Sequence, residues 1–214
     1  MIDNFYGKYV IAKATSKNSG GELLSADNII GDVYDIVCEY ENGVYKAFTR
    51  NRFNQTPCYF NEDVSRETYI LKNKGFRLFA ILTLVGFTYS DDKDNSNYWA
   101  EFAVIGFKES DNDVFLPFIE TFTNEIDKGI RPTLDLTNEN IKEIQVGDFS
   151  VLSNREPLPK KEKGTVFMKT HRKISEKFIE MGRNKKLGCY LVSIVFIFVI
   201  VIVVFLIIKL IIGF

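Results

Sequence analysis

The chain has 214 residues, with 27 basic and 28 acidic side chains and a hydrophobic fraction of 46%. A content of 19 Phe and 10 Tyr excludes a disordered chain, because such chains lack the apolar side chains that form a core. Three cysteines exclude a disulfide scaffold, and a single histidine without paired cysteines argues against a zinc site. We therefore expect no metal and no cofactor.

The charges are unevenly distributed along the chain. Residues 1–154 carry 15 basic and 24 acidic side chains, a net charge of −9, whereas residues 155–186 carry 11 basic and 4 acidic ones, a net charge of +7. The acidic part lacks the basic face that nucleic acid requires, so we expect no nucleic-acid partner. No basic patch leads into an apolar run at the N-terminus, so we expect no secretory signal peptide.

The first predicted elements are a strand over 8–14 and a flexible loop over 15–21. A hairpin over 32–50 follows, because Asn42-Gly43 is a preferred pair for a two-residue type I′ turn. Pairing the residues on either side of this turn fixes the register of the hairpin. That register places opposite charges across the sheet, Asp35 with Arg50 and Glu39 with Lys46, and gives these residues a structural role.

The apolar run over 76–89 is too short to span a bilayer and fits a central strand that is covered on both faces, with a buried helix as the alternative. Residues 98–108 are its expected antiparallel partner. The polar loop between them resembles a calcium loop only at Asp92, Asp94 and Ser96. It lacks the glycine and the last glutamate of that motif, so we expect a solvated loop.

Two helices are expected after these strands. The first starts at Pro117, ends at Gly129 and places Phe118, Ile119, Phe122 and Ile126 on one face. The second is capped by Thr137, carries Ile141 and Ile144, and ends at Gly147, before a last strand over 149–152. Because strands come first and helices later, we predict an α+β fold with an antiparallel sheet and one or two packed helices.

Residues 154–164 contain two prolines and a terminal glycine, which is typical of a linker. Beyond them, Ile174, Phe178 and Met181 share one face of a predicted helix. This basic segment either contacts anionic headgroups or is a solvated stalk. The residues expected to contact a membrane surface are Lys173, Lys177, Arg183, Lys185 and Lys186.

Residues 187–208 form an uncharged stretch of 22 residues that predicts a single transmembrane helix, with a buried core element as the alternative. Basic residues precede this stretch and only Lys209 follows it, so the positive-inside rule predicts a cytoplasmic N-terminal part and a tail-anchored layout. The predicted domains are a cytoplasmic α+β domain (1–153), a basic linker and amphipathic juxtamembrane segment (154–186), the transmembrane helix (187–208) and a short tail (209–214).

The sequence offers no catalytic constellation, because the only histidine lies in the basic segment, away from a nucleophile. The favoured function is a tail-anchored, single-pass membrane protein whose cytoplasmic domain binds a partner or senses a ligand. Its expected partners are a lipid bilayer and a protein of unidentified kind. Two alternatives stay open: a membrane-tethered hydrolase or transferase that uses carboxylates, and an oligomerising effector that perturbs membranes.

Overall fold

The computed structural model describes residues 5–89, 98–183 and 187–212. The chain divides into two compact units, Met1–Arg172 (unit 1) and Lys173–Phe214 (unit 2). Unit 1 contains all the strands of the described residues, and unit 2 contains two helices.

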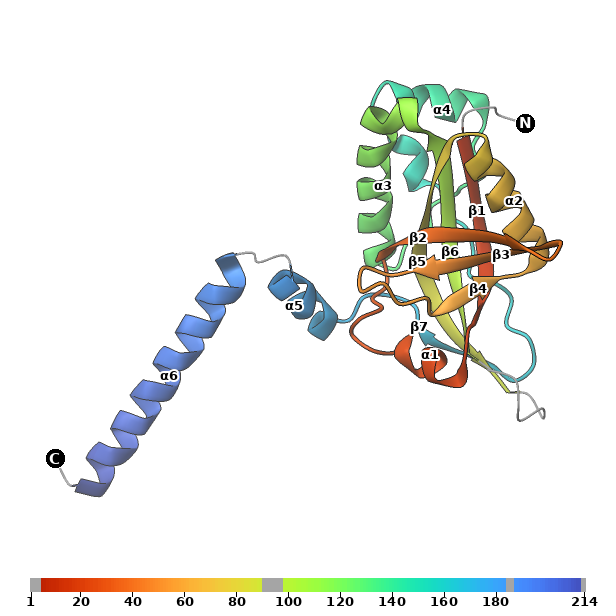
Figure 1. Ribbon diagram of the computed structural model, residues 1–214. Helices are drawn as coiled ribbons and strands as arrows, with labels where there is room; N and C mark the ends of the chain where they lie inside the picture. Colours follow the sequence, from red (N-terminus) through yellow and green to blue (C-terminus); the bar gives the residue numbers. More distant parts are fainter. Residues whose placement is uncertain (1–4, 90–97, 184–186, 213–214) are drawn as a thin grey trace. The chain divides into compact units, whose positions relative to one another are not determined.

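Unit 1 is built around a closed antiparallel barrel of six strands, counted over the described residues (Figure 1). The strands follow the order β2-β3-β4-β1-β6-β5, and pairing of β2 with β5 closes the ring. A further strand, β7 (Thr165–Lys169), pairs with β5. The bounds of the barrel strands are β1 Phe5–Ala14, β2 Val33–Glu41, β3 Val44–Arg50, β4 Cys58–Phe60, β5 Phe76–Thr88 and β6 Tyr98–Lys108.

The predicted fold class, an α+β fold with an antiparallel sheet and one or two packed helices, is wrong, because the sheet closes into a barrel. The ring centroid of Phe102 lies 5.2 Å from that of Tyr34 and 6.1 Å from that of Phe60. Their strands β2, β4 and β6 are not neighbours in the sheet, so these rings meet across the barrel interior. One face of the apolar strands is therefore buried by the other strands and not by a helix.

Helices cover the outer face of β1 and β6. The helix α3 (Asn112–Asp127) places Phe115 against Phe5 and Phe107, with ring centroids 5.5 and 5.0 Å apart. The helix α4 (Asn138–Gln145) begins at a capping box of Thr137 and Asn140 and buries Ile141 and Ile144. These contacts form the second layer of the apolar core.

The helix α2 (Glu62–Asn73) covers the barrel where β4 is too short to pair with all of β3. The Ser65 hydroxyl accepts a hydrogen bond of 3.1 Å from the backbone N–H of Ala47, which lies in β3 beyond the β3–β4 pairs. Asn61 caps the helix by accepting from the backbone N–H of Val64. A side chain of α2 thus satisfies a backbone donor that the short strand leaves open.

The hairpin prediction is confirmed pair by pair. β2 and β3 pair in the predicted register, from Glu41 with Val44 at the turn to Asp35 with Arg50. Asn42 and Gly43 have φ values of +52° and +82°, as a type I′ turn requires. Arg50 contacts Asp35 at 3.1 Å, whereas Lys46 contacts Glu41 at 3.4 Å in place of Glu39.

Other local predictions differ at their boundaries. The apolar run over 76–89 is the strand β5, and α3 begins at Asn112, so Pro117 lies inside that helix. Residues 17–22 form a short helix, α1 (Lys17–Glu22), capped by Ser16, where a loop was expected. Residues 150–153 form a 3-10 helix in place of a strand, and a second such turn spans Glu109–Asp111. The calcium-like loop, with Asp92, Asp94 and Ser96, lies outside the described residues.

Unit 2 consists of α5 (Ile174–Arg183) and α6 (Leu187–Ile212). The predicted transmembrane helix over 187–208 is not supported, because among the described residues no helix combines the length and the apolar content needed to cross a membrane. The single-pass, tail-anchored layout falls with this prediction.

Candidate functional site

The basic residues predicted to contact a membrane surface lie around α5. Lys173 immediately precedes the helix and Lys177 lies one turn into it, and both side chains are exposed. Arg183 is the last residue of α5, and its side chain is outside the described part. Lys185 and Lys186 lie outside the described residues. The structure therefore brings together two of the five, and the contact itself stays a prediction.

An apolar stripe accompanies these lysines on α5. Ile174 is 74% exposed and Phe178 is 52% exposed, and their spacing of four residues places them on one side of the helix. The side chain of Glu176 is buried, and its carboxylate accepts a hydrogen bond of 3.0 Å from the backbone N–H of Lys173. The exposed surface of α5 thus combines apolar and cationic side chains, as interfacial helices do.

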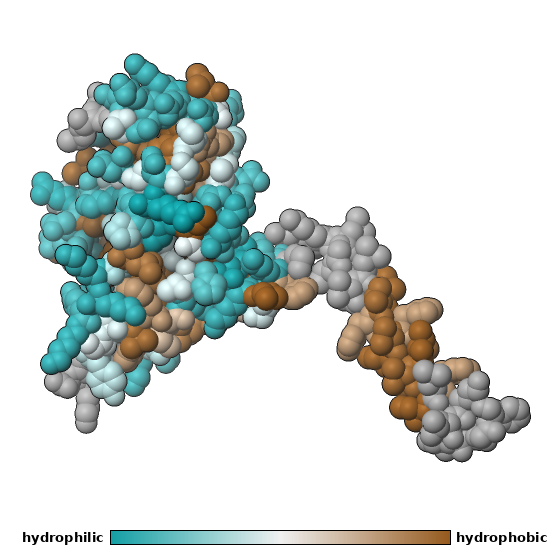
Figure 2. All heavy atoms as spheres, turned by 180° about the vertical axis from the view of Figure 1, so that it is seen from behind, coloured by the Kyte–Doolittle hydropathy of each residue, from teal (hydrophilic) through white to brown (hydrophobic). Residues whose placement is uncertain are grey.

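Helix α6 exposes apolar side chains at every position whose side chain is described. These positions are Val, Ile or Phe residues with exposed fractions of 46% to 67%, over residues 194–205, 207 and 208. Figure 2 shows this stretch in the colours of strongly hydrophobic residues. Because consecutive positions point in all directions around a helix, the apolar surface extends around α6 and is not confined to one face.

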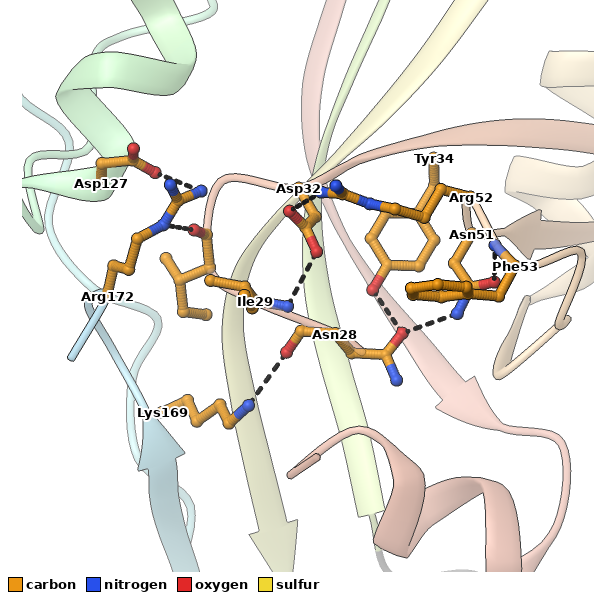
Figure 3. A network of polar contacts seen from close by, with 11 residues as sticks. Asn28, Ile29, Asp32, Tyr34, Asn51, Arg52, Phe53, Asp127, Lys169 and Arg172 are labelled. Carbon is orange, nitrogen blue, oxygen red and sulfur yellow. Dashed lines mark hydrogen bonds and ion pairs between the residues drawn. The ribbon is translucent and has the colours of Figure 1, made fainter. Parts of the chain in front are cut away.

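A polar network holds one end of the barrel to β7 (Figure 3). The side-chain oxygen of the buried Asn28 accepts from the Tyr34 hydroxyl at 2.7 Å and from Asn51 at 3.1 Å. The ammonium of Lys169, in β7, donates to the backbone carbonyls of Ser25 and Asn28 at 2.8 and 2.9 Å. These buried polar groups satisfy one another, which gives them a structural role.

The same network fixes the loop before β2 and the end of unit 1. The Asp32 carboxylate accepts from the backbone N–H of Ile29 at 3.0 Å and contacts Arg52 at 2.6 Å. Arg172 donates to the carbonyl of Ile30 and contacts Asp127 of α3, both at 3.0 Å. Residues 165–172, which the sequence places in a juxtamembrane segment, are thereby built into unit 1.

A second buried cluster joins Glu101 of β6 to Arg131. The two side chains are 4% and 8% exposed and lie 3.0 Å apart. Glu101 also accepts from the Thr83 hydroxyl at 2.8 Å, and the guanidinium of Arg131 lies over the Tyr9 ring at 4.2 Å. Burial raises the pKa of the Glu101 carboxyl, and this rise is opposed by the charge of Arg131 and the hydrogen bond from Thr83. Because the pair is closed off from solvent, it is a structural pair and not an accessible acid or base.

The described cysteines are shielded in unit 1. Cys58 is fully buried, and burial raises the pKa of its thiol far above the ordinary range. Burial also raises the pKa of the half-buried Cys38, against the weaker effects of its contact with Thr68 and of nearby Lys72. Both thiols are therefore in the protonated, poorly nucleophilic form at neutral pH.

Unit 1 has an open polar hollow of about 460 Å³ beside the barrel seam. Strands β2 and β5 pair over only three residues of each, ending at Asp35 with Phe79, and the hollow lies where they diverge. Its lining combines three basic side chains, two acidic ones and the ends of β5 and α2, namely Asp35, Ile36, Arg50, Lys72, Gly75, Phe76, Arg77, Leu78 and Glu109. We call it the seam hollow.

Sequence patterns did not reveal the seam hollow. Its residues come from β2, β3, α2, β5 and the 3-10 turn after β6, and only the closure of the barrel brings them together. The one available signal was the opposition of Asp35 and Arg50 in the hairpin register, which identified a surface pair and not a cavity wall.

Comparisons with known proteins add no further constraint: no protein-family model, curated protein or solved structure matches the chain. Across the described residues, no group of three or more His, Cys, Asp or Glu side chains is arranged to hold a metal ion. The candidate surfaces are therefore α5, α6 and the seam hollow.

Proposed function

We propose that the chain is a binding module that associates with a lipid bilayer through unit 2. The observation that carries this proposal is the apolar surface of α6, whose described Val, Ile and Phe side chains are all exposed. Removing one such side chain from water contributes about 1.5–3 kcal/mol. Burial of ten of the fourteen described side chains therefore contributes about 15–30 kcal/mol, which exceeds the cost of association of about 4–15 kcal/mol.

Lipid is favoured over a protein groove as the cover of α6 because of the distribution of these side chains. A protein groove covers one face of an amphipathic helix and leaves a polar face toward water. The described part of α6 has no polar face, from residue 194 to residue 205. Acyl chains can contact such a surface whichever side of the helix faces the bilayer.

The charges of α5 support the same partner. Lys173 and Lys177 are exposed next to Ile174 and Phe178, and each lysine near an anionic surface contributes roughly 1 kcal/mol. Anionic lipids are concentrated in the cytoplasmic leaflet, so the proposal includes a cytoplasmic location for unit 1. Unit 1 then presents a binding surface at the membrane, with a partner or ligand as its target.

Flotation with vesicles tests this proposal on the full chain. Detergent-solubilised protein is mixed with neutral phosphatidylcholine vesicles or with vesicles that also contain phosphatidylglycerol, the detergent is removed, and the mixture is centrifuged through a density gradient. We expect wild-type protein to float with both kinds of vesicle. A Val199→Glu/Val203→Glu variant should remain at the bottom, because two buried carboxylates oppose transfer into lipid.

Lysine variants test the electrostatic part. Lys173→Gln/Lys177→Gln should float with neutral vesicles as wild type does, but bind anionic vesicles about 5-fold more weakly per lysine removed. The matched control is Lys142→Gln/Lys160→Gln, which removes two exposed lysines of unit 1. Flotation of the Val199→Glu/Val203→Glu variant at the wild-type level, or wild-type protein that stays at the bottom, would refute lipid contact by α6.

A further inference from the structure

We infer that the seam hollow of unit 1 binds a small phosphorylated polyol, with the phosphate on Lys72 and Arg77 and the hydroxyl groups near Glu109. This inference goes beyond the proposed lipid contact and does not depend on it. It rests on the shape of the hollow, on the partners of its charged side chains and on their origin in separate elements.

The shape of the hollow follows from the way the barrel closes. β2 and β5 pair from Val33 with Ile81 to Asp35 with Phe79, and then part. The end of α2 occupies one side of the opening, so that Lys72 and Gly75 line the hollow together with the first residues of β5. A volume of about 460 Å³ lies within the range of small-molecule sites, which is about 300–1,000 Å³.

Two cations of the hollow have no carboxylate partner among the described residues. The ammonium of Lys72 contacts only the carbonyl of Ile36, at 3.4 Å. The guanidinium of Arg77 contacts the side-chain oxygen of Asn112 at 3.3 Å and lies 4.9 Å from the centre of the Phe79 ring. Both hydrogen bonds are long and are easily exchanged for stronger bonds to an anionic oxygen.

The third cation is already neutralised. Arg50 contacts Asp35 at 3.1 Å, so this pair contributes no net charge to the hollow. The remaining charged side chains are Lys72, Arg77 and Glu109, which together leave a net positive charge. Lys72 and Arg77 both line the hollow, and lysine and arginine are the residues that commonly bind phosphate.

Glu109 indicates what accompanies the phosphate. Its carboxylate lines the same hollow and repels a second anionic group, but it accepts hydrogen bonds from hydroxyl groups. A ligand that carries both a phosphate and hydroxyl groups offers partners to the cations and to the carboxylate of the hollow. A sugar phosphate or an inositol phosphate has this chemistry, and the latter occurs both as a free metabolite and as a lipid headgroup.

Calorimetric titration of the full chain in detergent tests the site without a bilayer. The probes are inorganic phosphate, myo-inositol 1-phosphate and unphosphorylated myo-inositol. We expect myo-inositol 1-phosphate to bind more tightly than inorganic phosphate, and myo-inositol not to bind. Lys72→Gln and Arg77→Gln should each weaken binding of both phosphates by about 10-fold or more. Lys74→Gln and Lys108→Gln, which remove nearby lysines that do not line the hollow, should leave binding unchanged.

Glu109→Gln should change the affinities for the two phosphates by different amounts. It should tighten inorganic phosphate, because a repulsive charge is removed, and reduce the advantage of myo-inositol 1-phosphate over phosphate. The inference is overturned if neither phosphate binds, if the Lys74→Gln and Lys108→Gln controls lose as much affinity as Lys72→Gln and Arg77→Gln, or if Glu109→Gln affects both phosphates equally.

Binding of the protein to vesicles identifies the source of the ligand. If the site takes a lipid headgroup, vesicles with phosphatidylinositol 4-phosphate should bind wild-type protein more tightly than Lys72→Gln/Arg77→Gln protein, while phosphatidylglycerol vesicles bind both equally. If the site takes a free metabolite, the soluble probe binds, and each kind of vesicle binds wild-type and Lys72→Gln/Arg77→Gln protein with equal affinity. Failure of lipid contact by α6 abolishes flotation with neutral vesicles and leaves the calorimetric result intact, so the two proposals fail separately.

Discussion

At the scale of single residues, burial is most complete for the charged pair of Glu101 and Arg131. Each side chain is almost fully removed from water, and the Nε of Arg131 has no hydrogen-bond partner among the described residues. Arg131 also donates to the carbonyl of Pro157 at 3.0 Å, which ties the segment after the 3-10 helix to the barrel wall. Such pairs give little net stability but become costly when one partner is lost.

The pH dependence of stability tests whether burial or the attraction of Arg131 dominates the pKa of Glu101. Burial raises the pKa of this carboxyl in the folded state above the unfolded value of about 4.3. Its contribution to stability is therefore complete below about pH 4 and is lost as pH rises through the raised pKa. In urea unfolding from pH 5 to pH 8, wild-type protein should lose stability relative to Glu101→Gln as pH rises.

The control for this experiment is Glu39→Gln, which removes an exposed carboxylate of β2. As pH rises, wild-type protein should not lose stability relative to Glu39→Gln in the way that it does relative to Glu101→Gln. If wild-type protein instead gains stability over Glu101→Gln with rising pH, the attraction of Arg131 outweighs burial and the sign of the pKa shift is wrong.

At the scale of elements, the hairpin of β2 and β3 depends on one turn. Gly43 has a φ of +82°, and a Cβ atom added there would meet nothing within 4 Å. Gly43→Ala should therefore cost about 1–2 kcal/mol of unfolding free energy through the backbone alone. Gly21→Ala is the control, because Gly21 lies in the helix α1 and a Cβ atom added there would also meet nothing within 4 Å. This substitution should stabilise the protein by about 0.4–1 kcal/mol. Equal effects of the two substitutions in urea unfolding would contradict this account of the turn.

The elements that sequence predicts well are those whose signal is local. Asn42-Gly43 and the alternating side chains beside it define the turn and the register, and Thr137 with Gly147 defines the ends of α4. Closure of the barrel is different, because Val33 pairs with Ile81 from a distant part of the chain. No local pattern distinguishes a strand buried inside a barrel from one buried between a sheet and helices.

The candidate sites follow the same division. Lys173 and Lys177 are four residues apart, so their proximity at the start of α5 could be inferred from the sequence. Lys72 and Arg77 are close in the chain but lie in a helix and a strand with a turn between them. They line one hollow only because β2 leaves β5 beyond Asp35, which is a property of the closed barrel.

At the scale of the whole molecule, the two units present different chemistry. Unit 1 is a folded barrel with a buried apolar core and mostly polar contacts at its surface, whereas the described part of α6 in unit 2 exposes Val, Ile and Phe throughout. Exposed apolar surfaces of this extent are rare on soluble proteins and mark sites of association. The central claim is therefore that α6 contacts acyl chains.

An environment-sensitive fluorophore on α6 tests this claim most directly. A nitrobenzoxadiazole label is attached at Ile200→Cys in a Cys189→Ser background, the unsubstituted background serves as the labelling blank, and Lys142→Cys on α4 is the matched control. Our account predicts that vesicles shift the emission at position 200 to shorter wavelength, that acyl-chain spin labels quench it, and that the label at position 142 does not respond. Emission at position 200 that is unchanged by vesicles and unaffected by the spin labels would contradict the account.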